Sequence, residues 1–117
     1  MRQRPTSRPF GLRDVMIVGL TLATAIIHVV LAIGTDDVTT KVMFSLNGLG
    51  YVGLVAALYL PQLRARRRLI RWALIAFTGV TVLGWVAIGD RIPIGFVDKA
   101  IEVVLLALLI LDARDEG

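Results

Sequence analysis

The stretch that decides the fold runs from Ile94 to Leu111, IGFVDKAIEVVLLALLIL, and carries Asp98, Lys99 and Glu102 in apolar surroundings. An α-helix rises about 1.5 Å per residue, so about 20 residues cross a hydrocarbon core of roughly 30 Å. The purely apolar part, Val103 to Leu111, covers less than half of that thickness. If the stretch spans a bilayer, its charges lie within the hydrocarbon or at its outer boundary. Charges at such depth are costly and usually face a protein interior along a functional path.

The composition predicts a membrane protein. Hydrophobic residues make up 56% of the 117 residues, and the mean hydropathy is +0.77, more than soluble globular domains usually reach. The lysines and arginines cluster beside long apolar runs, so we expect a lipid bilayer as partner and no nucleic acid. The chain has no cysteine, which excludes disulfides, thiolate metal sites and thiol catalysis.

Four apolar runs predict four transmembrane helices, at approximately residues 15–33, 42–60, 69–88 and 94–111. The first run is too long for the hydrophobic part of a cleavable signal peptide, so we expect it to remain as a helix. The turns between the runs are short, and short loops join antiparallel neighbours. We therefore predict an all-α membrane protein, with one transmembrane domain over residues 1–117 folded as an antiparallel up-down bundle of four helices.

Basic residues predict the orientation of this bundle in the cell membrane. They gather in a tail at residues 1–13, in a loop at 61–68 and at Arg114, all on one side, whereas the other side has Lys41 and Arg91. By the positive-inside rule both termini are then cytoplasmic. The arginines of and after the loop are expected to act as topology determinants and to contact anionic lipid or an acidic partner surface: Arg64, Arg66, Arg67, Arg68 and Arg71.

Each predicted span carries its polar side chains on one helical face, which is typical of a helix whose interior face differs from its lipid face. Counted from the cytoplasmic edges at about 1.5 Å per residue, these side chains fall into two layers. We expect an outer layer of His28, Asn47, Trp85 and Asp98, and a central layer of Thr24, Tyr51, Thr81 and Glu102.

Asp98, Lys99 and Glu102 give the strongest indication of a site. They either bind an ion, a proton or a ligand, or form a structural salt-bridge network in which Lys99 extends toward the membrane surface. His28, the one histidine, is open to three interpretations: a proton relay, a ligand to haem or metal, or a hydrogen-bond partner of Asp98. One histidine without cysteine supplies few ligands, so we predict no metal and no cofactor.

Asn47, Tyr51 and Trp85 are further candidate site residues. Asn47 and Tyr51 stand four residues apart in NGLGYVG, which contains the pattern G-x-G-x-x-G. We reject a dinucleotide site, because no strand precedes the pattern and no βαβ unit surrounds it. The glycines instead let a neighbouring helix approach closely. Trp85 fits either an interfacial aromatic belt or the interior stripe.

The sequence shows no nucleophile–base pair, no metal-ligand repeat and no phosphate-binding loop, so catalysis ranks last among the functions considered. The leading hypothesis is a transport or permeation protein, acting as a homo-oligomer, that moves protons, cations or a small polar solute. The alternative is a non-catalytic accessory subunit that docks on a larger membrane complex through small-residue seams such as Gly19–Ala23 and Gly53–Ala57. A membrane enzyme or cofactor-binding protein that uses His28, Asp98 and Glu102 is the third hypothesis.

Overall fold

The computed structural model describes residues 10–89 and 91–116, and it is all-helical over these residues. Its elements are α1 (Leu12–Ile33), α2 (Val38–Tyr59), the 3₁₀ helix η1 (Pro61–Arg66), α3 (Arg67–Ile88) and α4 (Pro93–Glu116). The four predicted helices are confirmed, and α4 continues past the expected end at residue 111. Most of the predicted basic tail, including Arg2, Arg4 and Arg8, lies outside the described residues.

Local chemistry explains where the first two helices begin and end. Asp14 accepts a hydrogen bond from the backbone N–H of Gly11 at 2.9 Å, which satisfies a free donor at the start of α1. At the start of α2, the hydroxyl and the backbone N–H of Thr40 donate to Asp37 at 2.6 and 2.9 Å, and these bonds hold the pKa of that carboxyl below its ordinary value. α2 ends before Pro61, which forces the preceding residue into an extended conformation.

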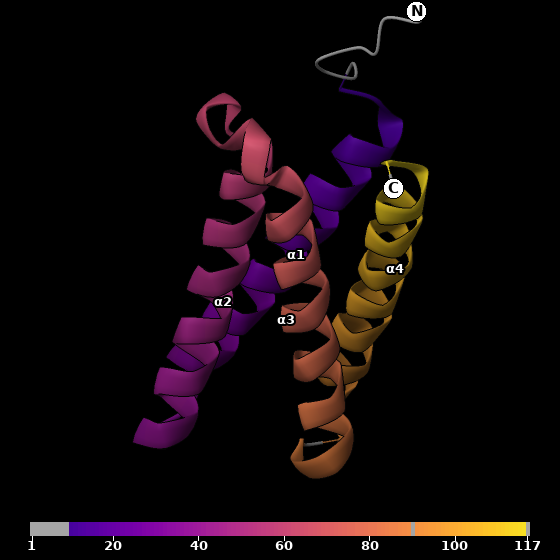
Figure 1. Cartoon of the computed structure of the whole chain (residues 1–117). Coiled ribbons are helices and arrows are strands. Elements are labelled where there is room, and N and C mark those ends of the chain that lie inside the picture. Colours follow the sequence, from indigo (N-terminus) through magenta and orange to yellow (C-terminus); the bar gives the residue numbers. More distant parts are fainter. Residues whose placement is uncertain (1–9, 90, 117) are drawn as a thin grey trace, which may run out of the picture.

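The four helices form a ring of antiparallel neighbours. α1 packs on α2, α2 on α3, α3 on α4, and α4 closes the ring against α1. The start of α1, the helix η1 and the end of α4 therefore lie at the same end of the bundle (Figure 1). Helices of 22 residues measure about 33 Å, close to the thickness of a bilayer's hydrocarbon core.

The distribution of side chains is reversed relative to a soluble protein. Among the described residues, α1, α2 and the η1–α3 segment are long and apolar enough to cross a membrane. α4 has the length, with 24 residues, but carries Asp98, Lys99 and Glu102. Large apolar side chains such as Ile88 and Leu12 are exposed on the outside, whereas charged side chains such as Glu102 are buried within the bundle. This arrangement fits a protein with an apolar solvent around it.

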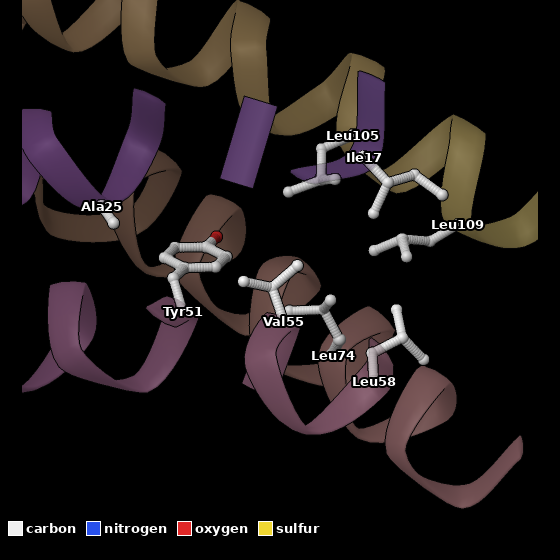
Figure 2. Close-up of a cluster of buried hydrophobic side chains, with 8 residues drawn as sticks. All are labelled: Ile17, Ala25, Tyr51, Val55, Leu58, Leu74, Leu105 and Leu109. Carbon is white, nitrogen blue, oxygen red and sulfur yellow. The ribbon is translucent and has the colours of Figure 1, made fainter. Parts of the chain in front are cut away.

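An apolar layer occupies the bundle between two polar regions. Leu105 and Leu109 of α4 follow Glu102 by one and two helical turns, and they pack with side chains from the other three helices (Figure 2). The next turn of α4 brings Asp112, which is also buried. We call this layer the apolar plug: Ile17, Val55, Leu58, Leu74, Leu105 and Leu109.

Candidate functional site

The structure gathers buried polar side chains from three helices on one side of the apolar plug. α4 contributes two carboxylates and an amine, α1 a hydroxyl and an imidazole, and α2 a phenol. All six side chains are buried, and the most exposed of them, Lys99, is only 9% exposed. We call this group the central cluster: Thr24, His28, Tyr51, Asp98, Lys99 and Glu102.

Lys99 joins the two carboxylates of α4. Its ammonium nitrogen lies 2.9 Å from Asp98 Oδ2 and 2.5 Å from Glu102 Oε1. Neighbouring positions on one helix make this possible, because residues three apart share a face and the long lysine side chain reaches the preceding carboxylate. Lys99 therefore neutralises charge inside the bundle and does not extend toward the membrane surface.

The remaining carboxylate oxygens accept hydrogen bonds from the other helices. Thr24 Oγ1 donates to Asp98 Oδ1 at 2.5 Å, and the Tyr51 hydroxyl donates to Glu102 Oε2 at 2.6 Å. Every carboxylate oxygen of the cluster thus faces a donor. An ionised carboxylate accepts hydrogen bonds at both oxygens, and this arrangement provides a donor for each of them.

His28 completes the cluster and is oriented by its own helix. Its Nδ1 lies 2.8 Å from the backbone carbonyl oxygen of Thr24, and a carbonyl only accepts, so we assign a proton to Nδ1. The other ring nitrogen, Nε2, faces Asp98 Oδ2 at 3.7 Å. Phe44 of α2 packs edge-on against the imidazole. Asp98, the hydrogen-bond partner predicted for His28, therefore faces the imidazole at ion-pair distance, and this separation is longer than a hydrogen bond.

The charges of the central cluster do not cancel unless a cation is added. Two carboxylates against one ammonium leave one negative charge when the imidazole of His28 is neutral. A net charge is expensive in a buried, poorly solvated interior. The cluster therefore has the electrostatics of a site for one proton or one small cation.

Three residues of the central cluster carry atoms that can bind a metal ion. Single ligand atoms of His28, Asp98 and Glu102 lie within 4.8 Å of one another. The ammonium of Lys99 already bridges the two carboxylates, so a metal ion has to displace it to bind both. The donor set thus suits a proton better than a metal.

Comparison with protein families gives one finding. A family model matches residues 2–111, which is nearly the whole chain and includes every residue of the central cluster. The chain belongs to DUF7475, a family of unknown function. No curated protein and no solved structure matches the sequence. Membership of DUF7475 assigns no activity to this chain.

Two predicted site residues lie elsewhere in this DUF7475 chain. The side-chain amide nitrogen of Asn47 donates to Thr81 Oγ1 at 2.9 Å and links α2 to α3. The side-chain oxygen Oδ1 of Asn47 is buried without a hydrogen-bond partner among the described residues. Trp85 packs edge-on against Phe96 and lies under the guanidinium of Arg91 at 4.2 Å, near the end of α3. The predicted outer layer therefore comes together only at His28 and Asp98.

The structure corrects the lipid contact predicted for Arg71. This side chain is 2% exposed, and it donates to Asp112 Oδ2 at 2.9 Å and to Glu116 Oε1 at 2.7 Å. Its guanidinium is thus engaged inside the bundle, where a headgroup cannot reach it. Arg67 is partly buried and donates to the carbonyl of Leu58 at 2.9 Å. The other three arginines of the predicted lipid contact are exposed: Arg64, Arg66 and Arg68.

Arg71 belongs to a second polar group that the sequence analysis missed. Arg13 forms ion pairs with Asp112 at 3.0 Å and with Asp115 at 2.7 Å, so this group joins the start of α1 to the end of α4. The missed signal is the spacing of Asp112 and Glu116, which puts two carboxylates on one face at the end of a predicted span. We call it the end network: Arg13, Arg71, Asp112, Asp115 and Glu116.

Proposed function

We propose that this chain is a multi-pass membrane transport protein that moves protons or small cations, with the central cluster as its binding site. The observation that carries the proposal is the pair of buried, hydrogen-bonded carboxylates that share a single ammonium. A purely structural network needs no residual charge, and a buried residual charge attracts a cation. Ionisable residues inside a membrane usually mark such a path.

The proposal includes α4 as a fourth membrane span, with both termini in the cytoplasm. Burial of Asp98, Lys99 and Glu102 inside the ring of helices supports the span, because the outer face of α4 is left apolar. The basic residues support the orientation, since most of them lie at the end where α1 begins and α4 ends, while Lys41 and Arg91 lie at the other.

We further propose that the protein acts as a homo-oligomer in the cell membrane. The apolar plug closes the single bundle on one side of the central cluster, so a path within one protomer is tight. A shared path between protomers relieves that restriction. Chemical crosslinking in the membrane tests the oligomer, and a strictly monomeric protein that still transports contradicts it.

The transport proposal is tested in reconstituted vesicles. Purified protein is placed in lipid vesicles with an internal pH dye, and proton entry is driven by the membrane potential that valinomycin sets up from a potassium gradient. We expect Asp98→Asn and Glu102→Gln to lower the flux at least about tenfold, because each removes a charge of the site. Asp36→Asn is the matched control, since Asp36 is exposed in the turn between α1 and α2. Wild-type flux in Glu102→Gln overturns the proposal.

An accessory subunit remains the second candidate, and one observation favours it. Gly19 and Gly53 are exposed, with open space where a side chain would project. Ala23 and Ala57 follow each glycine by one turn, so both helices present a smooth surface on which another helix can pack. Purification from the native membrane in mild detergent tests this function. A stable complex with a different protein favours the accessory role, and a homo-oligomer alone contradicts it.

A further inference from the structure

We propose that the central cluster holds one proton, carried on His28 Nε2 and facing Asp98 Oδ2, and that Lys99 acts as a tethered cation that keeps metal ions out. The use of this proton in transport rests on the proposed function. The binding of the proton at His28 rests only on the geometry of the cluster. It narrows the transported species from cations in general to the proton.

The proton position follows from the orientation of His28. Nδ1 is directed at the carbonyl oxygen of Thr24, so its hydrogen is committed there. A neutral imidazole would then present the lone pair of Nε2 to a carboxylate oxygen 3.7 Å away, an unfavourable arrangement. A hydronium ion of the bulk solvent can give its proton to Nε2: its O–H bond breaks, an N–H bond forms, and water is released. The imidazolium then forms an ion pair with Asp98, and the net charge of the cluster changes from minus one to zero.

The other groups around His28 do not supply the missing charge. From α4, Asp98 and Glu102 are the anions and Lys99 is the cation already shared between them. From α2, the ring of Tyr51 lies 6.1 Å from the imidazole, and its hydroxyl is committed to Glu102. Lys41, also on α2, donates to the carbonyl of Ala32 at 2.7 Å, one turn beyond His28. Among the described residues, α3 does not pack against α1.

Lys99 explains why the ligand is a proton and not a metal ion. Its ammonium sits between Asp98 and Glu102 at hydrogen-bond distance from both, the position that a bridging cation would take. The outer oxygens of the same carboxylates are occupied by the hydroxyls of Thr24 and Tyr51. A metal ion would have to displace the ammonium and leave it buried without a partner, which is strongly unfavourable.

The single histidine of the chain makes the proton directly observable. Protein labelled with ¹⁵N-histidine is purified in detergent, and the ring nitrogens are recorded by NMR at neutral pH. We expect both nitrogens of His28 to carry protons in the wild type, and Nε2 to lose its proton in Asp98→Asn. Asp36→Asn should leave the spectrum unchanged. An unprotonated Nε2 in the wild type, or an imidazolium that persists in Asp98→Asn, overturns the inference.

Cobalt(II) tests the role assigned to Lys99. We expect no paramagnetic shift of the His28 signals when Co²⁺ is added to the wild type, and a clear shift in Lys99→Met. A shift in the wild type overturns the inference, and this result does not depend on whether the variant folds. A folded Lys99→Met protein that ignores Co²⁺ also overturns it.

These experiments separate the two proposals. The NMR measurements need no membrane and no gradient, so a protonated His28 without flux in vesicles leaves the proton site standing and removes the transport function. If instead the flux depends on Glu102 and His28 carries no second proton, the transport function stands and the proton site on His28 is removed.

Discussion

Lys99 is the residue on which the electrostatics of the bundle depend. It carries the only ammonium of the central cluster, and this one group contacts two buried carboxylates. Placing all three groups on α4 lets both ion pairs form within one helix. The other helices then add hydroxyl donors and an imidazole, not further ammonium or guanidinium groups.

Removal of Lys99 should be among the most damaging substitutions in the chain. We expect Lys99→Met to lower the free energy of unfolding by about 3–5 kcal/mol, because it leaves buried carboxylates without their cation. Arg68→Met is the matched control, since Arg68 is an exposed cation, and its cost should stay within about 0.5 kcal/mol. Chemical denaturation in detergent micelles measures both. Equal stability of the two variants contradicts the burial of a charge network.

Thr24 and Thr21 allow a comparison of one substitution at two buried sites of α1. Thr24 donates to the carboxylate of Asp98, whereas Thr21 donates to the carbonyl of Ile17 in its own helix. We expect Thr24→Val to cost about 1.5–3 kcal/mol, the range for a hydrogen bond to a charged group. Thr21→Val removes a local bond that competes with the helix and should cost less than about 1 kcal/mol. Thermal unfolding in detergent compares them, and equal costs argue against the bond between α1 and α4.

At the scale of the helices, α1 and α2 pack closely at Gly48. A Cβ atom there would meet the carbonyl oxygen of Ala25 and a methyl group of Val29, both at 3.1 Å. We expect Gly48→Leu to separate the two helices and to cost about 1–3 kcal/mol or more. Gly53→Leu on the same helix projects into open space and should change stability by less than about 0.5 kcal/mol in detergent. Denaturation curves measure the difference, and a tolerated Gly48→Leu contradicts the packing of α1 on α2.

The helices were predictable from the sequence because their signals are local. Runs of apolar residues, with proline and glycine residues between them, predicted the four α-helices but not the 3₁₀ helix η1. The i, i+4 spacing of Asp98 and Glu102 predicted that both lie on one face of α4. Contacts between helices depend on how each helix is rotated, which short-range spacing does not determine. Arg71 shows this limit: its partner Asp112 is 41 positions away, so an arginine beside an apolar run was interpreted as a headgroup contact.

The orientation of the whole molecule can be read out with single cysteines, because the chain has none of its own. Thr39 lies at the start of α2 and Ala65 lies in η1, at opposite ends of the bundle, and both are exposed. We expect Thr39→Cys to react with a membrane-impermeant maleimide on intact spheroplasts, and Ala65→Cys only after lysis. The reverse pattern contradicts the cytoplasmic placement of both termini.

The apolar plug also determines how a current through this molecule would behave. Along α4, Glu102 and Asp112 are separated by about 15 Å of helix lined with leucines. If the proposed transport runs through the single bundle and not between protomers, no continuous file of water crosses this barrier while the helices stay in this arrangement. Each passage then has to wait for the bundle to rearrange. The rate should then saturate as the gradient grows and should rise steeply with temperature. An open pore would instead follow the driving force in proportion.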